Sequence, residues 1–313
     1  MSKEAIIELT ELTKKYDDIT AVDRLTLSVY QGEIFGLLGP NGAGKTTTIL
    51  MLLGLCEPTA GKMKVCGLDP TYQPILVKEK VGYLPDEVGF YENLSGLENL
   101  LFTAALNRIP PATARRRAEA LLEQVGIADR ARDKVQTYSR GMKQRLGLAD
   151  ILIREPEIII LDEPTNGIDP EGVRELISLI RELSRERGMT VLLSSHHLYQ
   201  VQQICDRVGL FVDGKLIDAG PIKELAYNLF KNDPLLLEVE AEPADEQLIS
   251  LLEANEHVSK VVRNGSRLNI HCRQDISAEI AATIVNRGAR LTHLSRHDYG
   301  LDEIYHRYFE GGS

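Results

Sequence analysis

The stretch Gly39-Pro40-Asn41-Gly42-Ala43-Gly44-Lys45-Thr46 decides the fold class of this chain, because it matches the phosphate-binding pattern G-x-x-x-x-G-K-[ST]. Residues 33–38 before it predict a short buried strand, and residues 47–55 after it predict an apolar helix. Glycines in such a loop let backbone N–H groups converge on one anion, and the helix N-terminus adds its positive end. A glycine-rich turn can match by chance, but the flanking elements make that the weaker interpretation.

The chemistry of the loop assigns separate roles to its last residues. Lys45 is expected to reach the β- and γ-phosphates of a nucleoside triphosphate, and Thr46 to offer its hydroxyl to Mg²⁺. The residues expected to bind the nucleotide here are Gly39, Pro40, Asn41, Gly42, Ala43, Gly44, Lys45, Thr46 and Thr47.

Composition narrows the class of protein further. The 313 residues carry a formal net charge of −10, with 43% hydrophobic and 26% charged residues, as in ordinary globular proteins. Binding to nucleic acid is not expected, because affinity for its backbone comes from Lys and Arg. The start, Met1-Ser2-Lys3-Glu4, has no signal-peptide pattern, and no apolar run approaches the ~20 residues that span a bilayer. We expect a cytoplasmic protein, with any membrane part supplied by another chain.

The order of expected elements indicates an α/β domain over residues 1–232. Residues 5–38 alternate like strands, residues 95–153 are helical, and the continuous apolar run 158–161 is typical of a central parallel strand. Strands alternating with helices imply a mostly parallel sheet. We therefore expect a mostly parallel sheet, an antiparallel β subdomain and a helical subdomain at about 90–153.

The tail, residues 233–313, has a different pattern. Strand, helix, a hairpin turning at Asn264-Gly265, a second helix and a last strand follow one another, which is the β-α-β-β-α-β order of ferredoxin-like domains. Four of its histidines, at positions 271, 293, 297 and 306, do not have metal-ligand spacing. We expect a small accessory or regulatory α+β domain, serving as a second dimer contact or a ligand site.

A second chemical element ends the apolar strand at residues 158–161. Asp162 and Glu163 follow it directly, at the rim of the sheet where open α/β folds bind ligands. Asp162 is suited to hold Mg²⁺, and Glu163 to polarise an attacking water as general base. A solvated pair of carboxylates at a strand end is the alternative, and the nearby phosphate loop makes it the weaker one.

A third element precedes an amphipathic helix. Ser139 and Gly141, in the run Tyr138-Ser139-Arg140-Gly141-Met142, stand at that helix N-terminus and predict a further anion site. Because the phosphate loop already accounts for one nucleotide, this site is expected to meet a different phosphate.

Residues 4 to about 225 resemble the ATP-binding cassette (ABC) ATPases, because several motifs occur in the order of that family. Residues 39–46 look like Walker A, 158–163 like Walker B and 138–142 like the signature motif, while 166–169 is similar to the D-loop. With the tail domain, the chain most resembles ATPase subunits of bacterial multidrug, antibiotic or ABC-2-type exporters. The resemblance implies ATP and Mg²⁺ as cofactors, with two nucleotides sandwiched in a head-to-tail homodimer between Walker A of one copy and Ser139 and Gly141 of the other.

The resemblance also assigns roles to single residues. His196, after Ser194-Ser195, is similar to the switch histidine that contacts the γ-phosphate. His197 beside it is the alternative, but the family pattern puts the functional histidine directly after Ser195, which leaves His197 in the first turn of the following helix. Tyr16 resembles the aromatic residue that stacks on adenine, with an ordinary surface tyrosine as the alternative. Asp169 resembles a residue that reaches the partner subunit, or it simply caps the helix beginning at Pro170. The catalytic set implied by residues and resemblance together is Glu163, His196 and Lys45.

Two positions depart from the commonest pattern of the family. The signature has Arg140 where glycine is usual and Met142 where glutamine is usual. Asp86, after Pro85, stands where many members have a metal-binding glutamine. We expect Asp86 to keep a metal-linked role with altered geometry, so the expected metal-binding residues are Thr46, Asp86 and Asp162.

The function expected from the resemblance is an ATP hydrolase that powers a membrane exporter at the inner face of the cell membrane. Its partners would be a second copy of the chain and an integral membrane subunit, contacted by the region after Asp86 that includes Phe90-Tyr91 and Leu94. The alternative is a soluble ABC ATPase acting on a ribosome or DNA. One cassette and no sustained heptad run favour the exporter.

Overall fold

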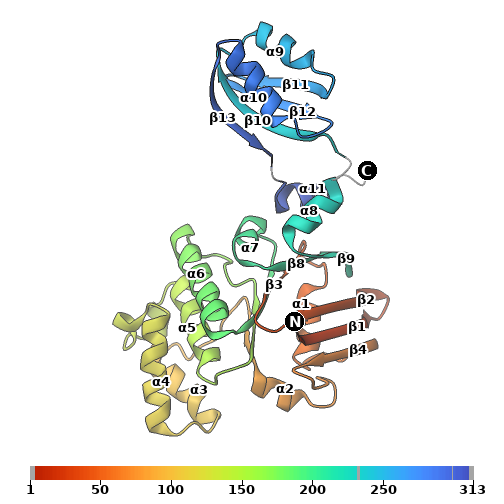
Figure 1. Ribbon diagram of the computed structural model, residues 1–313. Coiled ribbons are helices and arrows are strands. Elements are labelled where there is room, and N and C mark those ends of the chain that lie inside the picture. Colours follow the sequence, from red (N-terminus) through yellow and green to blue (C-terminus); the bar gives the residue numbers. More distant parts are fainter. Residues whose placement is uncertain (1–3, 231–232, 298, 310–313) are drawn as a thin grey trace. The chain divides into compact units, whose positions relative to one another are not determined.

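The computed structural model of this chain describes residues 4–230, 233–297 and 299–309. It contains two compact units, Met1–Ile222 and Lys223–Ser313, which are described separately below (Figure 1). The domain boundary expected from the sequence lies between residues 232 and 233, and residue 232 is outside the described residues. Residues 1–3, which belong to the stretch expected to have no signal-peptide pattern, are also outside them.

The chain divides at the first residue of helix α8 (Ile222–Phe230), so the rest of this helix belongs to the second unit. The reason lies in contacts within the second unit. The Phe230 ring at the end of α8 stacks on the Tyr299 ring, with centroids 4.0 Å apart, and the Arg307 guanidinium lies 5.8 Å from the Phe230 centroid. These aromatic contacts join α8 to the last helix of the chain, α11 (Leu301–Phe309).

A twisted, mostly parallel sheet forms the centre of the first unit. Its strands, in spatial order, are β5 (Val81–Leu84), β6 (Ile158–Asp162), β7 (Thr190–Ser195), β3 (Ile34–Leu38), β8 (Arg207–Val212) and β9 (Lys215–Gly220). Neighbours from β5 to β8 pair in parallel, and β9 pairs antiparallel with β8. Strands β3, β6 and β7 are buried throughout, as expected for apolar runs covered on both faces. The fold class expected from the phosphate loop is confirmed.

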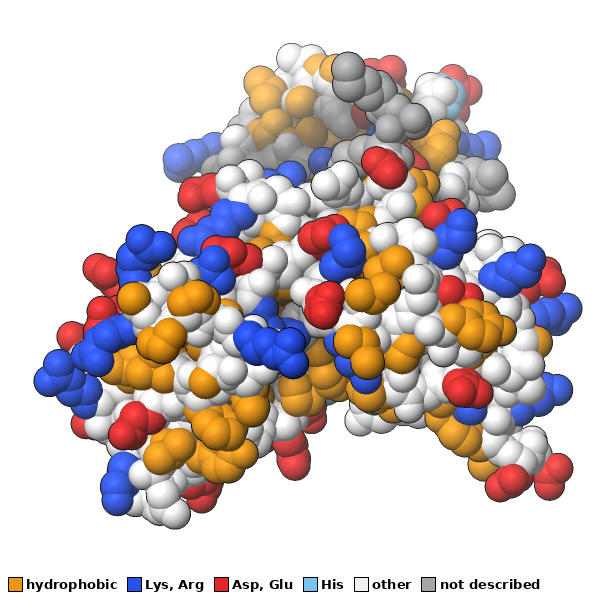
Figure 2. Space-filling view, turned by 90° about the horizontal axis from the view of Figure 1, so that it is seen from below, with side chains coloured by type: hydrophobic (Ala, Val, Ile, Leu, Met, Phe, Trp, Pro, Cys, Tyr) orange, Lys and Arg blue, Asp and Glu red, His pale blue; other side chains and the backbone are white. Residues whose placement is uncertain are grey.

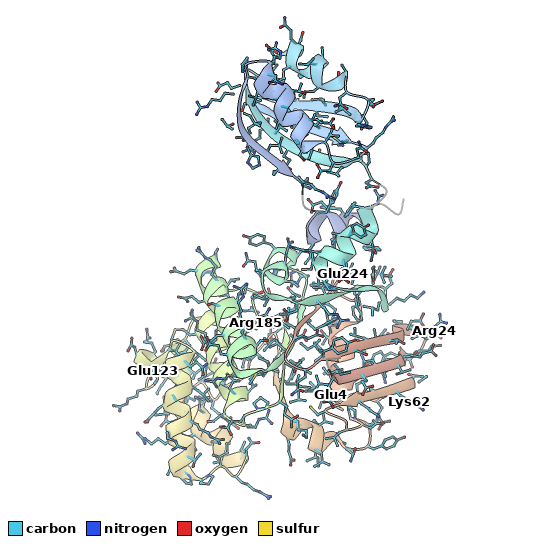
Figure 3. All side chains as sticks on the ribbon, viewed as in Figure 1. Glu4, Arg24, Lys62, Glu123, Arg185 and Glu224 are labelled. Atoms are coloured by element: carbon cyan, nitrogen blue, oxygen red, sulfur yellow. The ribbon has the colours of Figure 1, made fainter. Side chains whose placement is uncertain are left out.

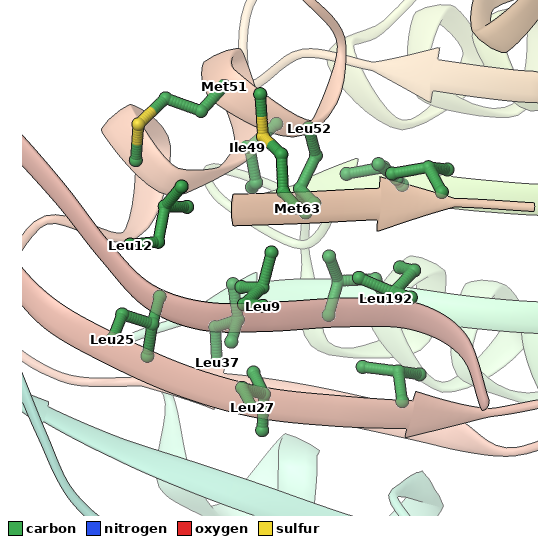
Figure 4. Packing of buried hydrophobic residues seen from close by; sticks show 14 of the residues in the cluster. Leu9, Leu12, Leu25, Leu27, Leu37, Ile49, Met51, Leu52, Met63 and Leu192 are labelled. Atoms are coloured by element: carbon green, nitrogen blue, oxygen red, sulfur yellow. The ribbon is translucent and has the colours of Figure 1, made fainter. Parts of the chain in front are cut away.

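An antiparallel sheet with the order β2-β1-β4 packs beside the central sheet. Its strands are β1 (Ala5–Tyr16), β2 (Ile19–Tyr30) and β4 (Ala60–Val65). Its inner face, including Leu9, Leu12, Leu25, Leu27 and Met63, packs on helix α1 and the central sheet (Figure 4). Charged side chains such as Arg24 and Lys62 lie on its outer edge (Figure 3). This packing holds one end of α1 beside the phosphate loop.

Helices make up the rest of the first unit (Figure 1). They are α1 (Lys45–Leu52), α2 (Pro74–Lys80), α3 (Gly96–Leu106), α4 (Pro111–Gln124), α5 (Arg140–Leu152), α6 (Pro170–Arg187) and α7 (Leu198–Ile204), with short 3₁₀ turns η1 (Ala128–Arg130) and η2 (Val135–Thr137). Helix α3 begins at a complete capping box, in which Ser95 and Glu98 satisfy each other's backbone N–H groups. Helices α3 to α5 lie within the region expected to be helical, whereas α2 was not expected.

The second unit contains an antiparallel sheet with the order β11-β12-β10-β13. Its elements are β10 (Leu235–Glu242), α9 (Glu246–Glu253), β11 (Val258–Asn264), β12 (Arg267–Cys272), α10 (Ser277–Asn286) and β13 (Arg290–Arg296). Leu237 and Val239 of β10 share a core with Leu248 of α9 and Ile280 of α10, so both helices cover the same sheet face. This order and strand arrangement is the expected ferredoxin-like fold.

In the described part of the chain, no helix combines the length and the apolar composition that crossing a bilayer requires.

Candidate active site

The loop Gly39–Thr46 joins β3 to α1, and two of its glycines cannot carry a side chain. A Cβ at Gly39 would lie 2.3 Å from the Phe211 carbonyl oxygen. Gly44 has φ +100°, and a Cβ there would lie 2.4 Å from the Ala21 carbonyl oxygen. Close backbone approach and a left-handed conformation thus both require glycine, which is why the sequence pattern demands it.

Helix α1 begins at this loop with its N-terminus uncapped. Gly44 is the N-cap residue, has no side chain to accept a hydrogen bond, and is followed by no acidic residue in the first turn. The first N–H groups of a helix have no partner within the helix, and they carry the positive end of its dipole. The start of α1 is therefore suited to bind a phosphate.

Lys45 directs its ammonium group back into the same loop. Its Nζ donates to the Gly39 carbonyl oxygen at 2.7 Å and to the Pro40 carbonyl oxygen at 3.2 Å. The side chain is buried, and Nζ lies 3.5 Å from Glu163 Oε1. A buried cation thus stands between the loop and the carboxylates at the end of β6.

Thr46 and Asp162 meet across the space between α1 and β6. The Thr46 hydroxyl donates to Asp162 Oδ2 at 3.1 Å, and the Ser194 hydroxyl donates to Asp162 Oδ1. Ser194 lies in β7, the strand next to β6, and is the register partner of Asp162. The parallel register therefore places both residues at the same edge of the sheet. Two hydroxyl groups therefore hold the carboxylate of Asp162, which is itself buried.

Glu163 lies just beyond the strand in an unusual backbone conformation. Its φ is +48°, a left-handed value that is uncommon outside glycine, and its N–H donates to both the carbonyl and the hydroxyl oxygen of Ser194 at 3.2 Å. The carboxylate is 12% exposed, and its Oε2 lies 2.9 Å from His196 Nδ1. The ammonium of Lys45 and the imidazole of His196 thus flank this carboxylate from two sides.

The two neighbouring histidines have different surroundings. His196 contacts Glu163, whereas the His197 N–H donates to Ser195 Oγ at 2.9 Å and its residue precedes α7. The imidazole rings lie 4.0 Å apart, and burial, followed by the neighbouring His196, lowers the pKa of His197. The side-chain contact with Glu163 therefore belongs to His196, and the role of His196 at the γ-phosphate stays a prediction.

A hollow of about 250 Å³ brings these groups together. Its lining residues are Ala21, Asn41, Gly42, Ala43, Gly44, Lys45, Thr46, Thr47, Asp86, Asp162 and Glu163. Burial, followed by the charges of Asp162 and Asp86, raises the pKa of the Tyr83 phenol to about 12. The residues that line the hollow combine an anion-binding loop with closely spaced carboxylates, and this arrangement is suited to a triphosphate and a hard cation.

Comparison with known proteins identifies the family. The family model described as ABC transporter matches residues 22–166. The chain is 34% identical over 308 residues to the bacitracin transport ATP-binding protein BcrA of Bacillus licheniformis, covering 98% of each protein. It is 42% identical over 235 residues to the uncharacterized ABC transporter ATP-binding protein YhcH of Bacillus subtilis, covering 75% of each. The chain belongs to the ABC transporter ATP-binding proteins.

A solved structure agrees with this assignment. The ATP-binding cassette MJ0796, solved as a dimer in a post-hydrolysis state with ADP and Pi, is 25% identical and superposes with a TM-score of 0.62 over 69% of this chain and 98% of that one. The present chain is thus an ATP hydrolase of the ABC family, and its first unit is the cassette.

The oxygen ligands at the hollow fit a magnesium ion. The Thr46 hydroxyl and the carboxylates of Asp162 and Asp86 are hard donors, which Mg²⁺ prefers. Within the residues that the structure describes, no cluster of three or more His, Cys, Asp or Glu residues could hold a metal alone. In phosphate-binding enzymes, Mg²⁺ is usually held by one or two carboxylates together with the phosphates of the substrate.

Ser139 and Gly141 of this ABC ATPase lie elsewhere. Ser139 is the N-cap of α5, where its hydroxyl accepts from the Met142 N–H at 3.3 Å. A Cβ at Gly141 would lie 3.3 Å from the Ile168 side chain, at the D-loop. Neither residue belongs to the described lining of the hollow. Within one chain, the signature residues are therefore not brought to the phosphate loop.

Tyr16, the expected adenine-stacking residue, also lies outside the lining of the hollow. Its ring is 46% exposed at the end of β1, its hydroxyl contacts Cys56 Sγ at 3.2 Å, and Lys14 Nζ lies 4.7 Å from its centroid. An exposed, supported ring can offer a face to a base. No contact with the phosphate loop assigns it that role, so stacking stays a prediction.

Sequence reasoning missed several residues that organise the cassette. Ser194, which the sequence marks only as a neighbour of His196, binds both Asp162 and the backbone of Glu163. Asn166 of the D-loop donates to both carboxylate oxygens of Asp86, at 3.2 and 3.1 Å. A hydroxyl residue at the carboxyl end of a strand next to Walker B was the available signal for Ser194. For Asn166 the linear sequence offers no comparable signal.

Proposed function

We propose that this ABC ATPase powers an ABC-2-type exporter whose substrate is an antibiotic or a similar amphiphilic molecule. The likeness to BcrA carries the proposal, because it extends over 98% of both proteins and so includes the small second unit as well as the cassette. A likeness confined to the cassette would support only an ATPase of the family.

Within the cassette, each residue has a physical task. The loop N–H groups and Lys45 bind the β- and γ-phosphates, while Thr46, Asp162 and Asp86 would hold Mg²⁺, which neutralises charge that develops on the phosphate oxygens. Glu163 accepts a proton from the attacking water as general base. His196 orients the Glu163 carboxylate through their 2.9 Å contact and offers its other ring nitrogen to the γ-phosphate.

The active site is proposed to be completed by a second copy of the chain. Ser139 and Gly141 stand at the start of α5, away from the hollow of their own chain, and are free to meet the nucleotide of a partner. Tyr16 would stack on the adenine, and Asp169 would lie near the interface. Splitting the anion site between two chains ties phosphate chemistry to opening and closing.

The homodimer is tested with a variant that binds ATP but hardly hydrolyses it. Glu163→Gln should elute as a dimer at saturating ATP and as a monomer with ADP. Adding Ser139→Arg to that variant should keep the protein monomeric, because a long side chain at the N-cap of α5 would block the contact between the two copies of the chain. A Glu163→Gln protein that stays monomeric at saturating ATP contradicts the composite site.

The membrane subunit is proposed to contact the helical region. Tyr91 and Leu106 are exposed by 57% and 68%, and Tyr91 packs edge-on against Phe102 of α3 at 4.9 Å. Figure 2, seen from the side where α2, α3 and α4 lie in Figure 1, shows apolar side chains gathered among charged ones. An exposed apolar surface of this kind marks a protein contact.

Copurification tests the exporter assignment. The chain should be coexpressed with a neighbouring gene product that carries about six stretches of ~20 apolar residues, solubilised in detergent and captured by a tag on either partner. Tyr91→Ser with Phe102→Ser should reduce capture, whereas Tyr199→Ser, an exposed tyrosine on α7, should not. Recovery with ribosomes or DNA instead would favour the soluble alternative.

The substrate class is tested in cells. Expression of both subunits should lower susceptibility to bacitracin-like antibiotics, and the same pair carrying Glu163→Gln should not protect. Protection that persists with Glu163→Gln contradicts ATP-driven export, because the pump would then act without turnover.

The second unit is proposed to be accessory or regulatory, through a second dimer contact or a small ligand. A chain lacking residues 223–313, the whole second unit, tests both. Unchanged dimerisation and turnover in that chain would dismiss them.

A further inference from the structure

The hollow that receives the phosphates is bordered by three carboxylates, and one of them is held differently from the others. Asp162 is held by Thr46 and Ser194, and Glu163 by Lys45 and His196, all from the phosphate loop or the ends of the central strands. Asp86 is held by residues outside the hollow. An uncompensated carboxylate at this place would repel a triphosphate.

Arg140 supplies the cationic partner of Asp86. It is the first residue of α5, and its guanidinium nitrogen lies 2.8 Å from Asp86 Oδ1. From the same helix, Gln144 Nε2 donates to the Asp86 carbonyl oxygen at 3.0 Å. Helix α5 thus holds both the side chain and the backbone of this residue.

The D-loop forms the third side of the cluster. Asn166 Nδ2 donates to both oxygens of the Asp86 carboxylate, and a Cβ at Gly167 would lie 2.9 Å from Arg140 Nε. The Arg140 side chain therefore lies directly over the Gly167 backbone, whose φ is +68°. Three segments that are distant in the sequence meet on one charge pair.

We propose that Arg140 is a positioning residue that neutralises Asp86, so that an aspartate can border the phosphate hollow without weakening ATP binding. The two opposite charges compensate each other, and together with Gln144 they tie the start of α5 to the nucleotide site of the same chain. This inference rests on the proposed nucleotide site.

The geometry of the ion pair sets the expected effect of removing Arg140 on stability and on ATP binding. The side chains of Arg140 and Asp86 are 44% and 39% exposed, so solvent screens the pair and its removal should not unfold the cassette. The charge left on Asp86 would still act on the highly charged phosphates in the hollow. At the effective dielectric of a protein surface, we expect an effect of about three- to tenfold on the dissociation constant of ATP.

Equilibrium titration with ATP in EDTA tests the proposal, because turnover does not occur there and the metal cannot mask Asp86. Arg140→Met should raise the dissociation constant about three- to tenfold, and Arg140→Lys should stay within about twofold of wild type. Asp86→Asn should bind ATP as tightly as wild type or more tightly. The double variant Asp86→Asn/Arg140→Met should return to within about twofold of wild type.

A salt series separates charge from shape. The loss in Arg140→Met should shrink as ionic strength rises, since screening weakens the repulsion by Asp86, whereas a packing defect would persist. Wild-type affinity in Arg140→Met, or a double variant as weak as the single one, overturns the proposal. Lys45→Ala in the same assay serves as the reference: if it binds ATP like wild type, the nucleotide site itself is wrong rather than the role of Arg140.

Discussion

The same pair of side chains, a glutamate and a histidine, occurs in both units of this protein in very different surroundings. In the cassette, Glu163 Oε2 lies 2.9 Å from His196 Nδ1. In the second unit, Glu238 Oε1 lies 2.8 Å from His297 Nδ1, and the other nitrogen of His297 lies 3.2 Å from Glu303. The distances are nearly equal, so the contact itself does not distinguish a chemical site from a structural one.

Burial and neighbouring charges make the difference. Glu163 is 12% exposed, has a left-handed backbone and faces the ammonium of Lys45 at the phosphate hollow. Glu238 is 44% exposed on a regular strand, and its histidine bridges to a second carboxylate. A carboxylate that is dry, strained and beside a buried cation is suited to act on a substrate. A solvated one mainly ties α11 to the sheet.

Replacing the two glutamates should give the largest contrast. Glu163→Gln should lower kcat for ATP hydrolysis by about 10²- to 10⁴-fold, because an amide cannot accept the proton of the attacking water. Glu238→Gln should leave kcat unchanged. Steady-state phosphate release by both purified variants measures this, and equal effects would remove the distinction between the two pairs.

Two glycines with positive φ offer the next contrast. Gly44→Ala should destabilise the cassette by about 3 kcal/mol or more, because strain adds to a Cβ lying 2.4 Å from the Ala21 carbonyl oxygen. Gly265→Ala, at a hairpin turn of the second unit with nothing within 4 Å of its Cβ, should cost only about 1–2 kcal/mol. Urea denaturation followed by hydrogen exchange in each unit compares them. A similar loss of stability in both variants would show that the phosphate loop can adjust to a side chain at Gly44.

A lysine pair tests the electrostatics of the hollow. Lys45→Ala should raise the dissociation constant of ATP by about ten- to a hundredfold, because it removes charge-assisted hydrogen bonds to phosphate worth about 1.5–3 kcal/mol. Lys62→Ala, on the exposed edge strand β4, serves as the matched control and should bind ATP normally (Figure 3). Calorimetric titration reports both values.

The smallest effect is expected from the histidine of the second unit. His297→Ala removes a half-exposed bridge between two carboxylates and should lower stability by about 1 kcal/mol or less, with kcat unchanged. His196→Ala should do the opposite, lowering kcat sharply while leaving the melting temperature nearly unchanged. A loss of turnover in His297→Ala would mean that the two units are functionally coupled.

Elements with strong local patterns were predictable. The phosphate loop, the buried strand before Asp162 and the β-α-β-β-α-β order of the tail all follow from short stretches of sequence, because glycine geometry and apolar periodicity act locally. Helix α2 (Pro74–Lys80) escaped prediction because it is a single short element that buries only Val77. The stacking of Phe230 on Tyr299, which places most of α8 in the second unit, joins distant parts of the sequence and has no local pattern.

The sequence alone determined that this protein binds a nucleotide phosphate and has a carboxylate pair at a strand end, because those requirements are carried by consecutive residues. Only the tertiary structure decided that His196 rather than His197 contacts Glu163, that Ser194 holds Asp162, and that Arg140 and Asp86 form one charge pair. Parallel register and helix packing bring these groups together from distant segments, and no local pattern records such distances.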